Sequence, residues 1–389
     1  MRSRSSFLVK TRLATPGPTE VPDEIRLAGA RPIIHHRSPS MERLMERIAR
    51  RLPPLFRTER DVFVSLTSGT GAMEAAVANL FGPEDHVLIV TNGYFGERFE
   101  QIAQAYGVKS LPIRSDWGTS VDIDAVRDAY AAHPDITGVL VVHSETSTGA
   151  LNDVEAIGRL FAGTDVVVVV DAISSLITHR LEMDEWGLDV VLAASHKAFM
   201  MPPGLAFIAI SEKAQKKSMR SPRPAYYWSF ERLKKFHPLP PSSPAVSLLF
   251  SLDVALDHIE GEGLPRIQQR AADLAEATLA GLLALGFRPL VIHPHYRNNV
   301  VTSVLAPEGV DTNDLQSTLE DEWGVTVTGG QAHLKGSLLR VGHVGAADFL
   351  DVVSIMAAIE LVLASDATSV SLGTGVAAYL KAVRQRETR

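Results

Sequence analysis

Six short apolar runs, separated by stretches of helical periodicity, constrain the fold of this 389-residue chain more than any other feature. Each run is rich in Val, Ile, Leu or Ala. Such runs are typical of strands buried on both faces, as in a parallel sheet between two layers of helices. The sequence therefore predicts an α/β fold with a mostly parallel sheet. The predicted strands lie at residues 61–66, 86–91, 138–143, 165–171, 189–194 and 205–210.

The pattern changes along the chain and predicts three parts. These are an N-terminal arm at residues 1–20, a large domain at 21–265 and a smaller α+β C-terminal domain at 266–389. Within the large domain, the stretch 221–244 is rich in Pro and aromatic residues, and we expect it to leave the sheet as an irregular segment. A long helix is expected over 245–260, where the apolar residues recur with helical spacing.

The composition excludes several classes of function. A net charge of −7 offers no attraction to nucleic acid or to an anionic membrane. No apolar run approaches the ~20 residues of a membrane-spanning helix, and the basic N-terminus lacks the apolar core of a signal peptide, so we expect a cytoplasmic protein. The chain has no cysteine, which rules out thiolate metal sites and cysteine nucleophiles. We predict no metal site, because the neighbouring His35 and His36 lack a distant acidic partner.

Polar side chains follow several of the predicted strands, at the edge where open α/β sheets bind their ligands. The turn at residues 68–72 can hold a phosphate through its backbone amides and the Thr70 hydroxyl, although a plain turn and helix cap would explain the same residues. Asp171 can either cap the next helix or pair with a cationic ring nitrogen. Glu145, Thr146 and Ser147 crowd polar groups at the end of another strand.

Lys197 stands between two apolar runs, just before a Pro-Pro-Gly turn, whereas a structural lysine usually lies on a solvated face. Together with Phe95 in NGYFGERF, these features supply a phosphate cradle, a carboxylate, an amine and an aromatic ring. Those are the parts needed to hold pyridoxal phosphate: Lys197 would form the Schiff base, and Asp171 would keep the pyridine nitrogen protonated.

Six motifs together resemble the class V aminotransferases of fold type I, and above all the alanine–glyoxylate and serine–pyruvate branch. The resemblance extends from TPGPTEVP near Thr15 to the last long helix and implies a pyridoxal-phosphate-dependent homodimer. The implied fold is a large domain, with a mostly parallel sheet between helices, plus a smaller α+β C-terminal domain. The six motifs are SGTGAMEAA, TNGYFGERF, HSETSTGALND, VVVDAISSL, SHKAFMMPPGLAFIAIS and LKGSLLRVGHVG.

The resemblance also implies a role for each matching residue. Lys197 is expected to hold the cofactor covalently and to transfer protons, Asp171 to pair with the pyridine nitrogen, and Arg340 to bind the substrate carboxylate. The further cofactor contacts that it implies are Thr70, Gly71, Ala72 and His196 at the phosphate, Phe95 on the ring face, Thr146 near the ring hydroxyl, and Ser242 or Ser243 at the phosphate of the neighbouring subunit.

Three of these positions depart from the usual family pattern. Relatives often have glutamine at the position of His196, tryptophan at that of Phe95, and threonine near Ser242. Histidine can still donate a hydrogen bond to a phosphate, but its charge depends on pH.

The resemblance favours an enzyme that moves an amino group from alanine, serine or a similar small amino acid to glyoxylate or pyruvate. Two alternatives stay open: a phosphonate-substrate transaminase, which needs extra cationic groups, and a kynureninase-like lyase. A cysteine desulfurase is excluded because it needs a cysteine nucleophile. The roles of His35, His36 and Arg37 are open as well; the resemblance suggests the active-site entrance or a dimer contact, with Arg37 as the alternative carboxylate clamp.

Overall fold

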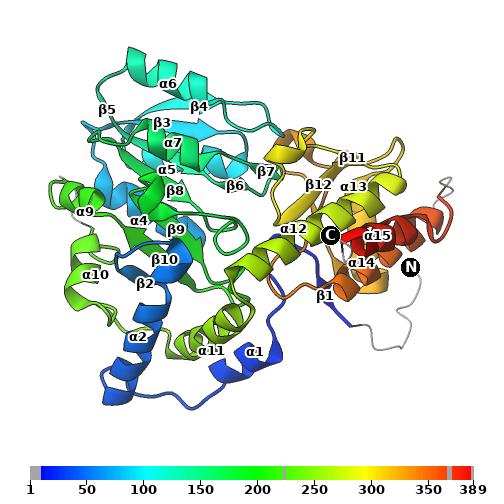
Figure 1. The fold of residues 1–389 in the computed structure, drawn as a ribbon, viewed down its shortest axis with the longest axis horizontal. Helices are drawn as coiled ribbons and strands as arrows, with labels where there is room; N and C mark the ends of the chain where they lie inside the picture. The colour runs from blue at the N-terminus through cyan, green and yellow to red at the C-terminus, as the bar shows by residue number, and fades with distance from the viewer. Residues whose placement is uncertain (1–9, 222–224, 366–369, 387–389) are drawn as a thin grey trace.

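The structure is a computed structural model that describes residues 10–221, 225–365 and 370–386. Within these ranges the chain forms a larger and a smaller lobe, each built around its own sheet (Figure 1). Helix α12 (Leu264–Ala284) runs from the larger lobe to the smaller one (Figure 1). Arg2 and Arg4, which belong to the predicted N-terminal arm, lie outside the described residues.

The larger lobe contains a seven-stranded sheet with the order β2-β10-β9-β8-β5-β3-β4. Strands β9, β8, β5, β3 and β4 run parallel to one another, whereas β10 is antiparallel to both of its neighbours. The prediction of an α/β fold with a mostly parallel sheet is therefore confirmed. The strands are β2 (Val62–Leu66), β3 (His86–Thr91), β4 (Lys109–Arg114), β5 (Ile136–Val142), β8 (Val167–Asp171), β9 (Val190–Ala194) and β10 (Leu205–Ile210).

Successive side chains of the central strands enter two hydrophobic cores, one on each face of the sheet. In β3, Leu88 and Val90 belong to one core, and Val87 and Ile89 to the other. Since neighbouring strand residues point to opposite faces, a strand covered on both sides must be apolar throughout, as these runs are. The first core also includes residues of α2 (Pro39–Arg51), α7 (Val154–Leu160) and α11 (Val246–Glu262), and the second those of α4 (Gly69–Leu80), α5 (Tyr94–Ala105) and α10 (Phe230–Phe236).

The smaller lobe contains a four-stranded sheet with the order β11-β12-β15-β14 and its own hydrophobic core. The N-terminal arm joins this lobe, because β1 (Arg12–Leu13) pairs with β13 (Val325–Thr326). The other elements of the lobe are β11 (Arg288–Pro289), β12 (Val301–Leu305), β14 (Thr328–Gly329), β15 (Leu338–Gly342), α13 (Thr312–Trp323), α14 (Phe349–Ser365), α15 (Thr374–Arg386) and the 3-10 helices η1 (Pro294–Tyr296) and η2 (Ala332–Leu334).

The six predicted strands correspond to β2, β3, β5, β8, β9 and β10, and the helix expected over 245–260 is α11. Strand β4 has no counterpart among the predictions, because it lies at the edge of the sheet, contains Pro112 and has no fully buried residue. The segment 221–244 is not irregular throughout, since it contains α10. The predicted division at residue 265 falls within the first turn of α12.

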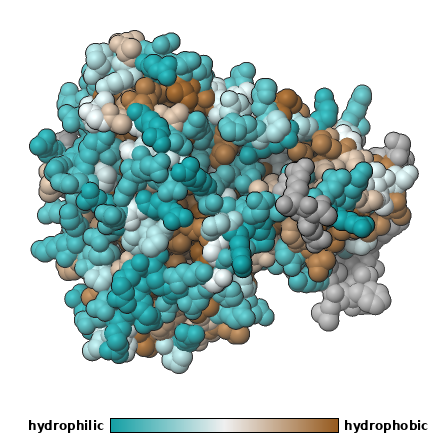
Figure 2. Space-filling model, viewed as in Figure 1, coloured by the Kyte–Doolittle hydropathy of each residue, from teal (hydrophilic) through white to brown (hydrophobic). Residues whose placement is uncertain are grey.

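Short elements complete the larger lobe. They are α1 (Asp23–Gly29), α3 (Pro53–Phe56), α6 (Ile123–Ala132), α8 (Met183–Trp186), α9 (Glu212–Ser218) and the hairpin of β6 (Ser144–Glu145) with β7 (Ala150–Leu151). In Figure 2, the surface of this lobe is mainly hydrophilic and is interrupted near its middle by apolar side chains. No helix in the described part of the chain is long and apolar enough to cross a membrane.

Candidate active site

The central groups of the predicted site lie at the carboxyl ends of three adjacent strands. Because β5, β8 and β9 are neighbours in the sheet, the segments that follow them converge on one edge. Asp171 is the last residue of β8, Lys197 lies three residues beyond the end of β9, and Glu145 lies three residues beyond the end of β5. The electrostatic interactions between these groups show that they share one site.

Lys197 is buried, with 7% of its surface exposed, and its Nζ donates a hydrogen bond to the Pro16 carbonyl oxygen at 2.8 Å. Burial lowers the pKa of this amine to about 8; Arg340 and Arg98 also lower it by repulsion, and Asp171 opposes them. The N-terminal arm covers the lysine closely, because a Cβ on Gly17 would lie 2.5 Å from the lysine Nζ. The side chain therefore lies in a confined space, and its amine loses its proton near pH 8.

The lowered pKa predicts how Lys197 reacts in the protein without cofactor. Only the neutral amine is nucleophilic, and with a pKa of about 8 its neutral fraction rises roughly tenfold between pH 7 and pH 9. We expect the rate at which this protein captures pyridoxal phosphate covalently to rise in the same proportion. Stopped-flow absorbance, with borohydride trapping at each pH, measures this rate. A rate that keeps rising steeply above pH 9 would show an ordinary lysine pKa instead.

Asp171 is buried at the end of β8 and accepts a hydrogen bond from the Ile173 amide through Oδ1 at 2.8 Å. Burial raises the pKa of this carboxyl to about 7, and Glu145 raises it further, whereas the Ile173 amide, Lys197 and Arg98 act in the opposite direction. The residues that follow Asp171 form turns, so the carboxylate does not cap a helix. A buried carboxylate of this kind needs a cationic partner to stay ionised.

The turn between β2 and α4 is the predicted phosphate cradle. Ser68 caps α4, and its hydroxyl accepts a hydrogen bond from the Gly71 amide. Glycine is required at two positions here: a Cβ on Gly71 would lie 1.8 Å from the Thr67 hydroxyl oxygen, and one on Gly69 would lie 2.7 Å from Ile173. The Thr70 hydroxyl is exposed at this turn, whereas the Gly71 and Ala72 amides donate to the hydroxyl and carbonyl oxygens of Ser68. The contact with Ile173 joins this cradle to the segment of Asp171.

Glu145 holds the start of α5 in place. Its carboxylate is fully buried and accepts hydrogen bonds from the Phe95 and Gly96 amides, both at 3.0 Å, and from the amide and hydroxyl of Ser147. Burial raises the pKa of Glu145, and its hydrogen bonds lower it. The carboxylate thereby fixes the first turn of α5, which carries Phe95.

Arg340, on β15 of the smaller lobe, reaches across to the larger lobe. Its Nη1 donates to the Thr146 carbonyl oxygen and its Nε to the Gly329 carbonyl oxygen, both at 2.8 Å. Burial lowers its pKa to about 10, and Glu145 opposes that shift, so the side chain is charged at neutral pH. The contact with Thr146 is through the backbone, which fixes the position of that residue relative to Arg340.

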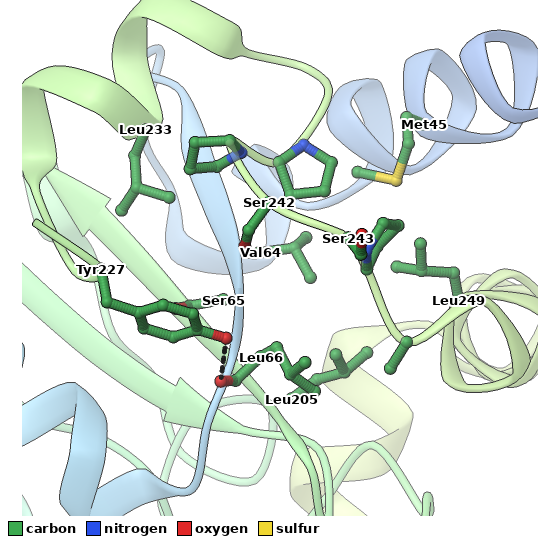
Figure 3. Close-up of a pocket in the computed structure, with 14 residues that line it drawn as sticks. Met45, Val64, Ser65, Leu66, Leu205, Tyr227, Leu233, Ser242, Ser243 and Leu249 are labelled. Atoms are coloured by element: carbon green, nitrogen blue, oxygen red, sulfur yellow. Dashed lines mark hydrogen bonds between the residues drawn. The ribbon is translucent and has the colours of Figure 1, made fainter. Parts of the chain in front are cut away.

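Several predicted residues lie apart from this cluster. Ser242 and Ser243 are exposed in the loop before α11, where they line a small pocket beside Met45 and Leu66 (Figure 3). The dashed line in Figure 3 marks the hydrogen bond from the Tyr227 hydroxyl to the Leu66 carbonyl oxygen. His35, His36 and Arg37 lie in the loop before α2, and the two histidine rings are 4.7 Å apart.

The residues at the strand ends fit pyridoxal phosphate. Among the described residues, the buried Nδ1 of His196 has no hydrogen-bond partner, although it lies next to Lys197 in the chain. Burial lowers the pKa of His196 to about 4, and Lys197 adds to this effect, so the ring is neutral at neutral pH and can both donate and accept. An amine, a buried carboxylate in need of a cation, and a glycine-rich helix start are the groups that this cofactor requires.

Comparison with known proteins identifies the family. The model of the family described as Aminotransferase class-V matches residues 26–347. The chain belongs to this family. A serine–glyoxylate aminotransferase of Methylorubrum extorquens is 32% identical over 388 residues, which are 97% of this chain and 96% of that protein. The structure of a ureidoglycine–glyoxylate aminotransferase from Bacillus subtilis is similar, with a TM-score of 0.92 and 25% identity over 98% of this chain and 100% of that one.

Another relative of this class-V aminotransferase has a different description. A Synechococcus protein described as the small subunit of a soluble hydrogenase is 37% identical over 376 residues, 95% of this chain and 97% of that protein. Iron–sulfur clusters are held mainly by cysteine thiolates, and this class-V aminotransferase has no cysteine. The predicted family and cofactor are confirmed: the chain is a pyridoxal-phosphate-dependent aminotransferase.

Sequence reasoning missed two groups that the structure places in the site of this class-V aminotransferase. One is the Pro16 carbonyl, which only the folded N-terminal arm brings to Lys197. The other is Arg98, whose guanidinium lies over the Phe95 ring, 4.7 Å from its centroid. The sequence did contain a signal for Arg98: it follows Phe95 by three residues, and residues three apart on a helix lie on the same face.

Proposed function

We propose that this enzyme transfers an amino group from a small amino acid, such as alanine or serine, to glyoxylate or pyruvate. The observation that carries the proposal is the position of Arg340, which is buried and donates from the smaller lobe to the Thr146 carbonyl oxygen beside Glu145. Arg98 is bonded to the Thr70 hydroxyl at the phosphate cradle, which leaves Arg340 for the substrate carboxylate. A single arginine in this role suits an amino donor with a single carboxylate. Because Gly17 lies close over Lys197, the site also favours a donor with a short side chain.

Each residue of the proposed active site has its own role in the reaction. Bound pyridoxal phosphate supplies the electron sink that stabilises negative charge at the α-carbon of the donor. Lys197 holds the cofactor and, once displaced, takes the α-proton and returns it. Asp171 keeps the ring nitrogen protonated, and Arg340 holds the α-carboxylate so that the α C–H bond faces Lys197. Phe95, Thr146 and His196 complete the proposed cofactor contacts.

A donor panel tests this substrate class. Single-turnover absorbance measures the conversion of the cofactor to its amine form with alanine, serine, aspartate, glutamate and 2-aminoethylphosphonate. We expect alanine or serine to react at least about tenfold faster than aspartate or glutamate, because the second carboxylate would be a buried anion without a partner, which costs at least about 1.4 kcal/mol. 2-Aminoethylphosphonate should also react more slowly, because it has no carboxylate for Arg340 to bind. The amine form should then be reoxidised by glyoxylate or pyruvate. A preference for the dicarboxylates or the phosphonate would overturn the proposal.

Arg340→Lys is expected to lower kcat/KM for every α-amino donor by about a hundredfold, through a higher KM and a lower kcat. A lysine ammonium cannot copy the two parallel hydrogen bonds of a guanidinium, so the donor is misplaced. Steady-state kinetics measure the change, and cofactor absorbance should show unaltered binding. The matched control is Arg37→Lys, in the exposed loop before α2. If Arg37→Lys has the larger effect, the carboxylate clamp is in that loop.

We also propose a homodimer in which the segment 225–244 reaches the phosphate of the neighbouring subunit. Ser242 and Ser243 are exposed, and Tyr226 and Tyr227 keep 76% and 46% of their surface exposed in the single chain. Apolar surface of this kind is typical of an interface. We expect an isologous dimer that buries more than about 2,000 Å² in total. Light scattering over a range of concentrations tests this, and an active monomer would refute it.

Dimers made of two different variants test whether the segment 225–244 contacts the phosphate of its own subunit or that of the neighbouring one. We expect Lys197→Ala and Ser243→Glu each to be inactive alone, the second because its new carboxylate repels the phosphate of the neighbouring subunit. When the two variants are mixed and allowed to exchange subunits, about a quarter of the active sites should become active. Half of the dimers then contain one subunit of each variant, and each such dimer has one intact site. If the segment instead contacts the phosphate of its own subunit, the mixture stays inactive.

A further inference from the structure

Arg98 lies between the phosphate cradle and the aromatic residue of the site. Its Nη1 donates to Thr70 Oγ1 at 3.0 Å, and its guanidinium carbon lies 4.7 Å from the centroid of Phe95 and 5.2 Å from that of Tyr94. α5 places Arg98 one turn after Phe95, so the same rigid helix supports both side chains. The bond to Thr70 joins α5 to the first turn of α4.

The charge of Arg98 is not neutralised within the described chain. No carboxylate among the described residues forms an ion pair with this half-buried guanidinium, whereas Arg114, nearby on β4, pairs with Glu100 of α5. The charge also reaches the catalytic groups, because Arg98 lowers the pKa of both Asp171 and Lys197. A half-buried cation without an anion, beside a cradle built for a phosphate, is placed to bind one.

The other predicted phosphate contacts are neutral. Thr70 offers a hydroxyl, and His196 is uncharged at neutral pH because burial lowers its pKa to about 4. The Gly71 and Ala72 amides are uncharged as well, and both donate to Ser68. A phosphate ester carries between one and two negative charges near pH 7. Helix amides and neutral donors stabilise such a charge only in part. Since Thr70 accepts from Arg98, its own hydroxyl hydrogen is free to be donated.

We propose that Arg98 is a cofactor-binding residue, whose guanidinium supplies the positive charge on the phosphate side of the site and orients the Thr70 hydroxyl toward the phosphate. This role does not depend on which amino donor the enzyme uses. It requires that the contribution of Arg98 to binding depend on the phosphate group itself. A residue that only supports the Phe95 ring would act equally on cofactor forms with and without phosphate.

Equilibrium binding to the protein stripped of cofactor separates the two roles. Pyridoxal phosphate and pyridoxal, which lacks the phosphate, are each titrated while protein fluorescence is followed. We expect Arg98→Met to weaken the binding of pyridoxal phosphate by about thirtyfold and that of pyridoxal by less than about twofold. Arg98→Lys, which keeps the charge but not the planar fork, should fall between Arg98→Met and the unaltered protein. Inorganic phosphate should compete with pyridoxal phosphate in the unaltered protein and much less in Arg98→Met.

Two further variants complete the test. Arg114→Met removes a paired arginine next to the same helix and should change neither affinity. Thr70→Val should weaken the binding of pyridoxal phosphate in the unaltered protein, with a smaller effect in Arg98→Met, because the two residues act through one hydrogen bond. Equal losses for pyridoxal phosphate and pyridoxal in Arg98→Met, or no loss for either, would overturn the proposal. If Arg98→Met does not fold, the comparison of Arg98→Lys with the unaltered protein decides in the same way.

Discussion

Replacing Lys197 by alanine is expected to reduce the rate of transamination by at least about a thousandfold, since a positioned acid–base group alone contributes 10²- to 10⁴-fold. The variant should still bind pyridoxal phosphate without a covalent bond, through the phosphate cradle and Asp171. Steady-state kinetics and cofactor absorbance measure these two properties separately. The large loss follows from the burial of the lysine, because no solvent-exposed amine replaces an Nζ held within 2.8 Å of the Pro16 carbonyl oxygen.

Two controls make the Lys197 result specific. Lys216→Ala removes an exposed lysine on α9 that pairs with Glu212, and it should leave the rate unchanged. Borohydride reduction of the unaltered holoenzyme, followed by peptide mapping, should label Lys197. A label on another lysine, or substantial activity in Lys197→Ala, would place the covalent bond elsewhere.

Asp171→Ala is expected to lower the rate by about a hundredfold or more, which corresponds to roughly 3 kcal/mol of transition-state stabilisation. Removing the carboxylate leaves the cationic ring nitrogen buried without its partner, so the ring loses its proton and accepts electrons less well. Asp171→Asn keeps the shape of the side chain and should lose a similar amount. Near-normal turnover in either variant would show that Asp171 only stabilises the local turn through its hydrogen bond with the Ile173 amide.

The stability of the protein without cofactor provides an independent test of Asp171. Its folded-state pKa is raised from 3.8 to about 7, so the stability that it contributes is fully present below about pH 4 and is lost as the pH rises through about 7. Asp171→Asn should remove this part of the pH dependence and make the stripped protein relatively more stable at pH 8. Urea unfolding at pH 5 and pH 8 measures the free energy of unfolding of both proteins. If this free energy changes equally with pH in the two proteins, the raised pKa of Asp171 is contradicted.

Much of the active site follows from local sequence pattern. The apolar runs that end at Asp171 and Ala194 predict strands, because only strands buried on both faces need such continuity. Parallel strands align their carboxyl ends, so the pattern also brings Asp171 and Lys197 to one edge of a sheet. The glycines of the turn at residues 68–72 mark the cradle for a similar reason, since a side chain at Gly71 would collide with Thr67.

The contacts that complete the site depend on the tertiary structure. The hydrogen bond from Lys197 to Pro16 joins residues 181 positions apart, and that from Arg340 to Thr146 joins residues 194 apart. Such pairs form only when the N-terminal arm and the smaller lobe pack against the larger one, and neither periodicity nor turn chemistry contains that information. Arg98 lay within a recognised motif, yet its bond to Thr70 depends on how α5 packs beside α4. Sequence by itself therefore determined the fold class, the family and the residues at the strand ends. The tertiary structure decided their charges and partners, because burial and neighbours distant in the chain set both.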